Sequence, residues 1–488
     1  MTGSRDGAIG RIESYFDDGG FLADLQRRVA IPTTSQETGS MPALRAYLAD
    51  EMSPSLARLG YACEIIDNPR PDYGPFLIAR RTEDPAAPTV LTYGHGDVVR
   101  GQDEQWRSGL SPWTIVVEGE RIYGRGTADN KGQHSINIAA LDAVLSERGK
   151  LGFNSTILIE TGEETGSPGL AEFCRQHKDK LKADALIGSD GPRLEPTRPA
   201  IFGGTRGTMN FTLSLDLRAG GHHSGNWGGL LANPGLILAH AIACIADVRG
   251  QIKVPEWRPK TLTNSVRMAL AGLTIDGGPD GPQIDTEWGE ESLTPPERVF
   301  GWNSFEVLAF KTGNPDKPVN AIPPSAIAYC QLRFVVGTDP NDILPALRRH
   351  LDKHGFGNIA VAPSREVIMN ATRLDPDDPW AKWAVASIQR TTGSKPDVIP
   401  NLGGSLPNEV FTDILGMPTV WVPHSYASCS QHAPNEHLLA PVAREGLAVM
   451  AGLFWDLGES RLAISRATMS VPPPGGNGTT SVTGRVGH

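Results

Sequence analysis

Residues 89–97 read TVLTYGHGD, a short apolar run that ends in a glycine, a histidine and an aspartate. A run of four to eight apolar residues is typical of a buried strand. In open α/β sheets, ligands bind just beyond the carboxyl ends of the strands. We therefore expect His95 and Asp97 to stand at such a strand end and to face a ligand.

Three further apolar runs precede acidic residues or a histidine in the same way. They cover residues 155–159, 185–187 and 419–422. The residues that follow these runs are Glu163, Glu164, Asp190 and His432. Strand-like runs that alternate with a helical pattern, here at 133–148, predict an α/β domain with a largely parallel sheet. Side chains far apart in the sequence would then meet at one edge of that sheet.

One more acid, Asp129, stands in a glycine-rich turn before the helical pattern at 133–148. Imidazole and carboxylate ligands together suit Zn²⁺, and also Mn²⁺ or Co²⁺. Two such ions need a bridging anion, and a carboxylate can supply it. A carboxylate that does not bind the metals can take a proton from an attacking water. This inventory predicts the centre of a two-metal hydrolase.

A second region, from about residue 204 to residue 365, has a different pattern. Phe211, Leu213 and Leu215 alternate with polar residues, and this period of two implies a half-exposed antiparallel sheet. Helical patterns flank it at 230–245 and 343–354. Residues 254–296 are rich in Pro, Gly and acidic residues, and we expect them to form a long surface excursion.

Length and pattern together predict the domain organisation. A chain of 488 residues is too long for a single hydrophobic core. We predict a catalytic domain of residues 1–203 and 366–468, with an α+β domain of residues 204–365 inserted into it. Residues 469–488 are rich in Gly, Ser, Thr and Pro, which predicts a disordered tail.

Composition excludes several classes of protein. The net charge of -10 argues against a nucleic-acid partner, because no surplus of basic residues exists to neutralise phosphates. The five cysteines are widely spaced, which argues against a disulfide framework or a thiolate zinc site. No run of 18 apolar residues and no apolar leader is present, so we expect a soluble cytoplasmic protein with no membrane partner.

The motifs in order resemble those of the co-catalytic zinc peptidase family. This family includes carnosinase, cytosolic non-specific dipeptidase, glutamate carboxypeptidase, aminoacylase and acetylornithine deacetylase. The matching segments are GHGDVV at 94–99, GRGTADNKG at 124–132, GEETGS at 162–167 and HAPNE at 432–436. Asn130 stands where the family usually has Met, and Ala433 where it often has Ser. The resemblance implies a zinc-peptidase-like domain with a central, mostly parallel sheet and an inserted α+β lid or dimerisation domain.

The resemblance also implies a set of metal ligands. Asp129 would bridge two divalent ions, with zinc as the first choice and manganese or cobalt as alternatives. His95 and Asp190 would complete the site of one ion. Glu164 and His432 would complete the site of the other.

Three residues would take part in the chemistry beside the metals. The resemblance assigns Glu163 as the general base and Asp97 as the carboxylate that orients the site, since a metal-bound histidine usually has such a partner. His223, directly before Ser-Gly, matches a histidine that stabilises the oxyanion. In the family this histidine can reach across a dimer interface into the partner's site. His222 is the neighbouring alternative, and we favour His223.

Four residues match positions that hold the substrate in the family. Asn320 and Arg333, 13 residues apart, correspond to a pair that binds a substrate carboxylate. A guanidinium suits this task because it donates two parallel hydrogen bonds to a carboxylate. Gly404 and Ser405 belong to a Gly-Gly-Ser-Leu-Pro segment that resembles a loop near the substrate terminus.

We therefore predict a homodimeric, metal-dependent hydrolase of peptide or amide bonds in small substrates that carry a carboxylate. The length of the inserted domain favours a dipeptidase- or carboxypeptidase-like enzyme. The alternative is an N-acyl amino-acid deacylase or another small-molecule amidohydrolase. A non-catalytic binding protein on the same fold is a remote alternative, because Glu163 is retained. A serine hydrolase is disfavoured, since no Gly-x-Ser-x-Gly motif is present.

Overall fold

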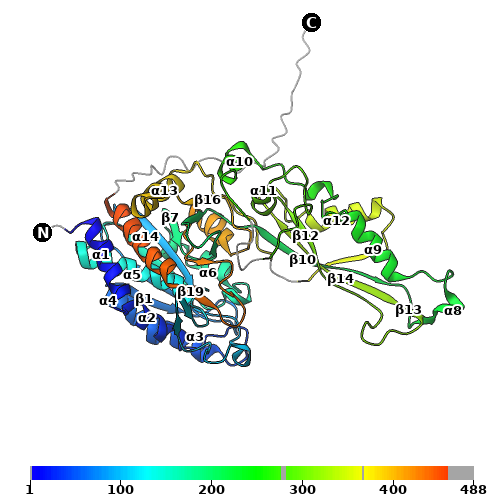
Figure 1. Ribbon diagram of the computed structural model, residues 1–488, viewed down its shortest axis with the longest axis horizontal. Helices are drawn as coiled ribbons and strands as arrows, with labels where there is room; N and C mark the ends of the chain where they lie inside the picture. The colour runs from blue at the N-terminus through cyan, green and yellow to red at the C-terminus, as the bar shows by residue number, and fades with distance from the viewer. Residues whose placement is uncertain (1–2, 276–281, 365–367, 460–488) are drawn as a thin grey trace, which may run out of the picture.

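The computed structural model consists of a large lobe and an elongated second lobe that projects from it (Figure 1). It describes residues 3–275, 282–364 and 368–459. The predicted disordered tail, residues 469–488, lies outside the described residues. No helix in the described part of the chain is long and apolar enough to cross a membrane.

The large lobe is built on an eight-stranded sheet with the order β1-β2-β6-β3-β7-β17-β9-β16. Its strands are β1 (Ala62–Ile66), β2 (Phe76–Arg81), β3 (Thr89–His95), β6 (Asn154–Glu160), β7 (Ala185–Gly188), β9 (Ala200–Phe202), β16 (Asp397–Ile399) and β17 (Thr419–Trp421). The central strands β6, β3, β7 and β17 run parallel to one another. This arrangement confirms the predicted α/β fold with a mostly parallel sheet.

Helices cover both faces of this sheet, which explains the almost continuous apolar runs of its central strands. On one face, buried side chains of five helices form a core with the sheet: α1 (Arg5–Asp17), α2 (Gly20–Val29), α5 (Lys131–Arg148), α13 (Pro379–Thr392) and α14 (Ala440–Glu459). On the other face, α6 (Leu170–Gln176) and the π-helical η5 (Val410–Leu415) pack against Tyr93 and Trp421. All residues of β6 are buried.

Shorter elements complete the large lobe. The helical pattern near residues 44–59 forms α3 (Met41–Ala46), the π-helical η1 (Tyr47–Met52) and α4 (Ser53–Arg58). A small sheet joins β4 (Val116–Glu118), β5 (Arg121–Tyr123) and β19 (His437–Leu439), and β8 (Pro192–Arg193) pairs with β18 (Ser425–Tyr426). The remaining helical turns are η2 (Asp103–Gln105), η3 (Glu163–Thr165) and α7 (Lys178–Leu181). All five cysteines are free thiols, as predicted.

The second lobe contains a four-stranded antiparallel sheet with the order β12-β14-β10-β15. Its strands are β10 (Gly207–Asp216), β12 (Ser304–Thr312), β14 (Ser325–Phe334) and β15 (Ala360–Pro363). Side chains of β10 alternate between buried and half-buried, and α9 (Pro234–Ile245) and α12 (Ile343–Lys353) share its core. The predicted antiparallel sheet is therefore confirmed, while the domain boundaries at residues 203/204 and 365/366 stay predictions.

The far end of the second lobe is formed by a small hairpin-like unit (Figure 1). Here β11 (His222–His223) pairs with β13 (Ala321–Ile322), and α8 (Ser224–Trp227) follows directly. We call this unit, residues 222–227 and 320–322, the tip. It is mostly exposed and stands well away from the large lobe.

The expectation of a surface excursion over residues 254–296 holds for most of its described residues, which are exposed, but several apolar side chains of this segment are buried. Val254 and Trp257 are buried in the core of the second lobe, where η4 (Pro255–Trp257) begins after Val254. Val266 and Leu270, on α10 (Asn264–Leu270), are buried in a core of the large lobe. Their burial removes apolar surface from water, so this segment packs against both lobes despite its polar composition. It continues to α11 (Pro295–Phe300), which starts with a capping box.

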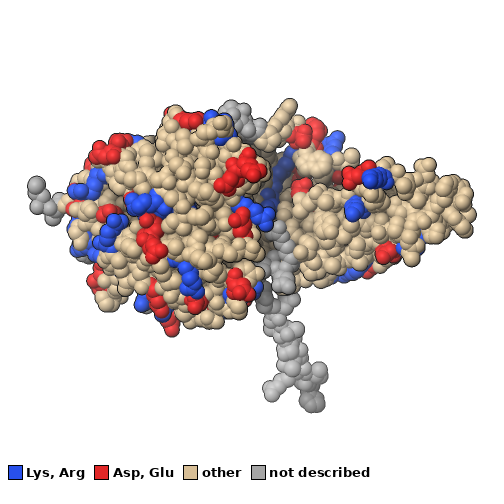
Figure 2. All heavy atoms as spheres, turned by 90° about the horizontal axis from the view of Figure 1, so that it is seen from below, with Lys and Arg blue, Asp and Glu red and all other residues tan. Residues whose placement is uncertain are grey.

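The face of the molecule seen in Figure 2 carries a mixture of acidic and basic side chains. Red and blue groups alternate over the large lobe, and no extended basic patch stands out on this face. Charges of both signs are thus interspersed on this face, and the absence of a nucleic-acid partner stays a prediction from the sequence.

Candidate metal centre and active site

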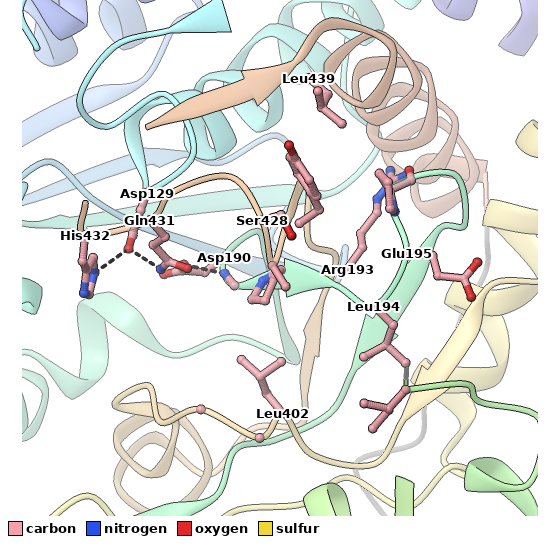
Figure 3. A pocket seen from close by; sticks show the side chains of 18 of the residues that line it. Asp129, Asp190, Arg193, Leu194, Glu195, Leu402, Ser428, Gln431, His432 and Leu439 are labelled. Carbon is pink, nitrogen blue, oxygen red and sulfur yellow. Dashed lines mark hydrogen bonds and ion pairs between the residues drawn. The ribbon is translucent and has the colours of Figure 1, made fainter. Parts of the chain in front are cut away.

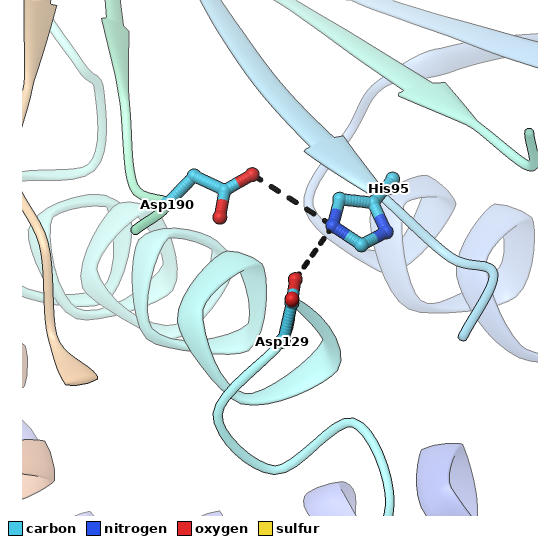
Figure 4. Close-up of side chains that lie close together, drawn as sticks. All are labelled: His95, Asp129 and Asp190. Atoms are coloured by element: carbon cyan, nitrogen blue, oxygen red, sulfur yellow. Dashed lines mark hydrogen bonds and ion pairs between the residues drawn. The ribbon is translucent and has the colours of Figure 1, made fainter. Parts of the chain in front are cut away.

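Two groups of potential metal ligands lie at the carboxyl ends of the central strands, and they share one residue. The first group is His95, Asp129 and Asp190, shown in Figure 4. The second is Asp129, Glu164 and His432. Within each group the ligand atoms lie within 4.8 Å of one another. The structure thus brings together all five residues that the sequence analysis selected as ligands.

The two carboxylate oxygens of Asp129 face different histidines. His95 Nε2 lies 2.9 Å from Asp129 Oδ1, and His432 Nε2 lies 2.9 Å from Asp129 Oδ2. Asp190 Oδ2 lies 3.7 Å from His95 Nε2, and Glu164 Oε2 lies 3.1 Å from His432 Nε2. A carboxylate with one oxygen directed to each of two ligand sets has the geometry that a bridge between two cations requires.

The charge of the cluster also fits divalent cations. Burial raises the pKa of Glu164 to about 7 and that of Asp190 to about 6, and the charge of Asp129 adds to both effects. Asp190 Oδ2 is buried and accepts no hydrogen bond from a described residue. Burial also raises the pKa of Asp129, but hydrogen bonds from His432 and His95 outweigh it and hold that pKa below its usual range. Buried carboxylates in excess of their partners favour a bound cation.

Asp97 orients two parts of this centre. His95 Nδ1 lies 3.0 Å from the backbone oxygen of Asp97, which can only accept, so Nδ1 carries a proton and Nε2 is the nitrogen that could bind a metal. The Asp97 carboxylate accepts the backbone N–H groups of Glu163 and Glu164 at 3.2 and 3.1 Å. It therefore holds the turn that presents both glutamates, in addition to its place beside His95.

Glu163 belongs to neither ligand group, although it lies half-buried beside them. Together with Asp129, Asp190 and His432 it lines a cavity of about 1270 Å³. Figure 3 shows this cavity, with Asp129 and His432 at one end and Glu195 toward the other. Burial raises the pKa of Glu163 well above its usual range, and the negative charges of Glu164 and Asp190 act in the same direction. A carboxylate in this place can exchange a proton with a molecule in the cavity.

The predicted substrate-binding loop lines the same cavity. Gly404 and Ser405 are among its lining residues. Arg333, near the end of β14, donates a hydrogen bond from Nη1 to Ser405 Oγ at 3.1 Å. The structure thus brings Arg333 to the loop that the sequence analysis had selected on separate grounds.

His223 and Asn320 lie elsewhere, at the tip. The two residues are close to each other, since the backbone N–H of Ser224 donates to the Asn320 carbonyl at 2.9 Å. The strand from Ser325 to Arg333 spans about 26 Å at roughly 3.3 Å per residue, and it separates Asn320 from Arg333. Asn320 and Arg333 therefore do not meet within one chain, and their shared role in binding a substrate carboxylate stays a prediction.

Two polar residues near the cavity gave no signal in the sequence. Arg206 is buried and donates from Nε to the carbonyl of Gly403 at 2.8 Å. Burial, and after it the positive charge of Arg333, lowers its pKa to about 10. Neither arginine forms an ion pair with a carboxylate of the described residues. Gln431 donates from its side chain to Asp129 Oδ2 (Figure 3). Single arginines and glutamines have no spacing pattern, so only the fold reveals them.

The chain is similar in sequence to known peptidases. Residues 91–456 match the sequence profile of Peptidase family M20/M25/M40. The Beta-Ala-His dipeptidase of Rattus norvegicus is 26% identical over 492 residues, which cover 94% of this chain and 97% of the relative. The Cys-Gly metallodipeptidase DUG1 of Candida albicans is 29% identical over 253 residues, which cover 48% of this chain and 51% of the relative.

Solved structures show the same fold. The di-peptidase Dug1p from Saccharomyces cerevisiae superposes with a TM-score of 0.75 at 22% identity, covering 94% of this chain and 100% of that one. Human carnosine dipeptidase 1 superposes with a TM-score of 0.71 at 24% identity, with the same coverage of 94% and 100%. The family profile spans well over half of the 488 residues and includes the whole ligand cluster. The chain therefore belongs to Peptidase family M20/M25/M40 and is a metal-dependent peptidase.

Proposed function

We propose that the protein is a dipeptidase that binds two divalent ions, preferably zinc, and cleaves small substrates with a free carboxylate. The observation that carries the proposal is the direction of the two Asp129 oxygens toward two separate histidine-containing ligand sets. Its relatives named as dipeptidases of Beta-Ala-His and Cys-Gly support the substrate class. Cytoplasmic location stays a prediction from the sequence.

In this proposal His95, Asp129 and Asp190 would hold one ion, and Asp129, Glu164 and His432 would hold the other. When bound, such ions would supply Lewis-acid activation of a water and of the scissile carbonyl. Glu163, which faces the cavity without a place in either ligand set, takes the proton of the attacking water and delivers it to the leaving amine. Asp97 keeps Glu163 in place because its carboxylate accepts a hydrogen bond from the backbone N–H of Glu163.

The substrate carboxylate binds on the side of Arg333 and the loop of Gly404 and Ser405. Arg333 already contacts Ser405, and it retains donors that no described carboxylate occupies. Arg206 lies directly behind this loop, and its charge makes the local potential more positive. A carboxylate is the small anionic group that the planar fork of a guanidinium fits best.

We further propose a homodimer in which His223 and Asn320 serve the active site of the partner subunit. Both residues are exposed at the tip, far from the metal ligands of their own chain. The edge strand β12 exposes Val307, Leu308 and Phe310, with 41%, 59% and 41% of each side chain accessible. An exposed apolar edge strand is prone to pair with another chain, which supports a contact at this lobe.

The substrate class can be tested by comparing three panels: free dipeptides, the same dipeptides with an amidated carboxyl terminus, and N-acyl amino acids. We expect metal-dependent cleavage of free dipeptides, with weak or no cleavage of the amides. Preferred cleavage of N-acyl amino acids would instead assign the alternative, a deacylase. Folded protein that binds no metal and cleaves none of the three panels would refute the enzyme assignment altogether.

Replacement of the proposed base, Glu163→Gln, should lower kcat by about 10²–10⁴-fold, the usual contribution of a general base. The metal content should stay unchanged, because Glu163 belongs to neither ligand set. Steady-state kinetics with metal analysis on the same sample checks both statements. Turnover close to that of the wild type would rule out Glu163 as the base.

Replacement of Arg333 by Ala should raise KM for free dipeptides by about 10–100-fold, corresponding to the loss of a charge-assisted hydrogen bond of ~1.5–3 kcal/mol. Cleavage of the amidated dipeptides should hardly change, since they lack the charge that Arg333 binds. The variant Arg373→Ala is a matched control, because Arg373 is also a largely buried arginine but contacts Asn401 and Thr261. Equal effects on acids and amides would contradict the role of Arg333.

The contribution of the partner subunit can be tested by mixing two inactive variants, Glu163→Ala and His223→Ala, after reversible dissociation. A mixed dimer combines an intact Glu163 from one chain with an intact His223 from the other in one of its two sites. Random mixing should therefore restore activity at about a quarter of all sites. If native mass spectrometry shows mixed dimers without restored activity, His223 does not act across the interface.

A further inference from the structure

We infer that Glu436 is a positioning residue for the metal centre: its buried carboxylate fixes the turn that carries Asp129 between the two ligand sets. The inference rests on the proposed two-metal function and deepens it. Glu436 itself lies in neither ligand group. It acts through the backbone around Asp129, and in the proposed mechanism it touches neither metal nor substrate.

One oxygen of Glu436 gathers three backbone donors of this turn. The N–H groups of Gly126, Ala128 and Asp129 all donate to Glu436 Oε1 at 3.0 Å. The N–H of Asp129 itself is among them, so the contact reaches the backbone of the shared ligand. Three converging N–H groups form a nest that favours a full negative charge. Each of these hydrogen bonds restricts the backbone conformation of the turn.

The second oxygen of Glu436 is held by Arg125, which belongs to the same turn. Arg125 Nη1 lies 2.8 Å from Glu436 Oε2, and both side chains are almost completely buried. The guanidinium also lies over the ring of Trp106, 5.7 Å from its centre. Arg125 Nε and Nη2 have no partner among the described residues. The cation therefore depends on Glu436 for its charge compensation.

Glu436 also connects two of the three segments that supply the second ligand set, those of His432 and Asp129. It lies four residues after His432, and its own carbonyl accepts the N–H of Gly124 at 3.0 Å. The loop of His432 is thereby joined to the turn of Asp129 by both backbone and side chain. A shift of either segment changes the distance between His432 and Asp129, which are ligands of the same site.

A glutamine at this position has almost the same shape but no charge. Its amide oxygen can still accept N–H groups, but its amide nitrogen cannot accept from Arg125 and would face a buried cation. Loss of an outer partner of a metal ligand typically costs 10–100-fold in metal affinity. Asp129 belongs to both ligand sets, so loss of the Glu436 charge should weaken the binding of both ions. Loss of His432 should weaken the binding of only one ion.

The test is zinc binding by the full-length variant Glu436→Gln, measured by competition with a chromophoric chelator. We expect both zinc affinities to fall by about 10–100-fold. The reference variants are Asp129→Ala, which should weaken both sites more strongly, and His432→Ala, which should weaken one. Glu436→Asp keeps the charge but draws the carboxylate back by one methylene, so we expect a smaller loss. This variant carries the test if Glu436→Gln does not fold.

A matched control separates positioning from stability alone. Asp456 is also a buried carboxylate with arginine partners, Arg5 at 3.0 Å and Arg390 at 2.9 Å, but it lies on α14 away from the centre. Asp456→Asn should lower the melting temperature of the metal-free protein without changing zinc affinity. Zinc affinities of Glu436→Gln and Glu436→Asp within about twofold of wild type would overturn the inference. Wild-type protein that binds no zinc would instead overturn the two-metal function on which it rests.

Discussion

The structure depends on one electrostatic constraint: several carboxylates are buried at one edge of a sheet, around Asp129. Each oxygen of Asp129 faces a histidine, and Glu164 and Asp190 stand beside them. Buried negative charge of this density is stable only with compensating positive charge. Two divalent cations would provide that charge, and the same cations would make the site chemically active. Stability and activity thus have a common physical origin here.

The parallel sheet explains how residues that are far apart in the sequence meet at one site. Strands β6, β3 and β7 run side by side in the same direction, so Glu164, His95 and Asp190 leave the sheet at one edge. Around them, hydrogen bonds from neighbouring carboxylates restrict the backbone turns that carry the ligands. Asp97 holds the turn of Glu163 and Glu164, while Glu436 holds the turn of Asp129. The ligand cluster thus lies at one end of a cavity that the loop contacted by Arg333 also lines.

The sequence predicted the large lobe well, because its central strands are apolar runs and its helices have amphipathic or apolar periodicity. It predicted the antiparallel sheet of the second lobe for the same reason. Within residues 254–296 it missed single apolar side chains such as Trp257, which pack in a core although Pro, Gly and acidic residues surround them. Distance along the chain also does not show that a strand carries Asn320 and Arg333 to opposite ends of a lobe.

By itself, the sequence determined the fold class and the set of metal-binding residue types, since short-range pattern and side-chain chemistry are properties of the chain alone. Only the tertiary structure showed that the two oxygens of Asp129 face the two ligand sets that the resemblance implied, that Gln431 and Glu436 contact Asp129, and that Arg206 contacts the loop of Gly403. It also placed His223 at the tip, away from the metal ligands of its own chain. Such arrangements depend on contacts between residues hundreds of positions apart, and no local pattern encodes those contacts.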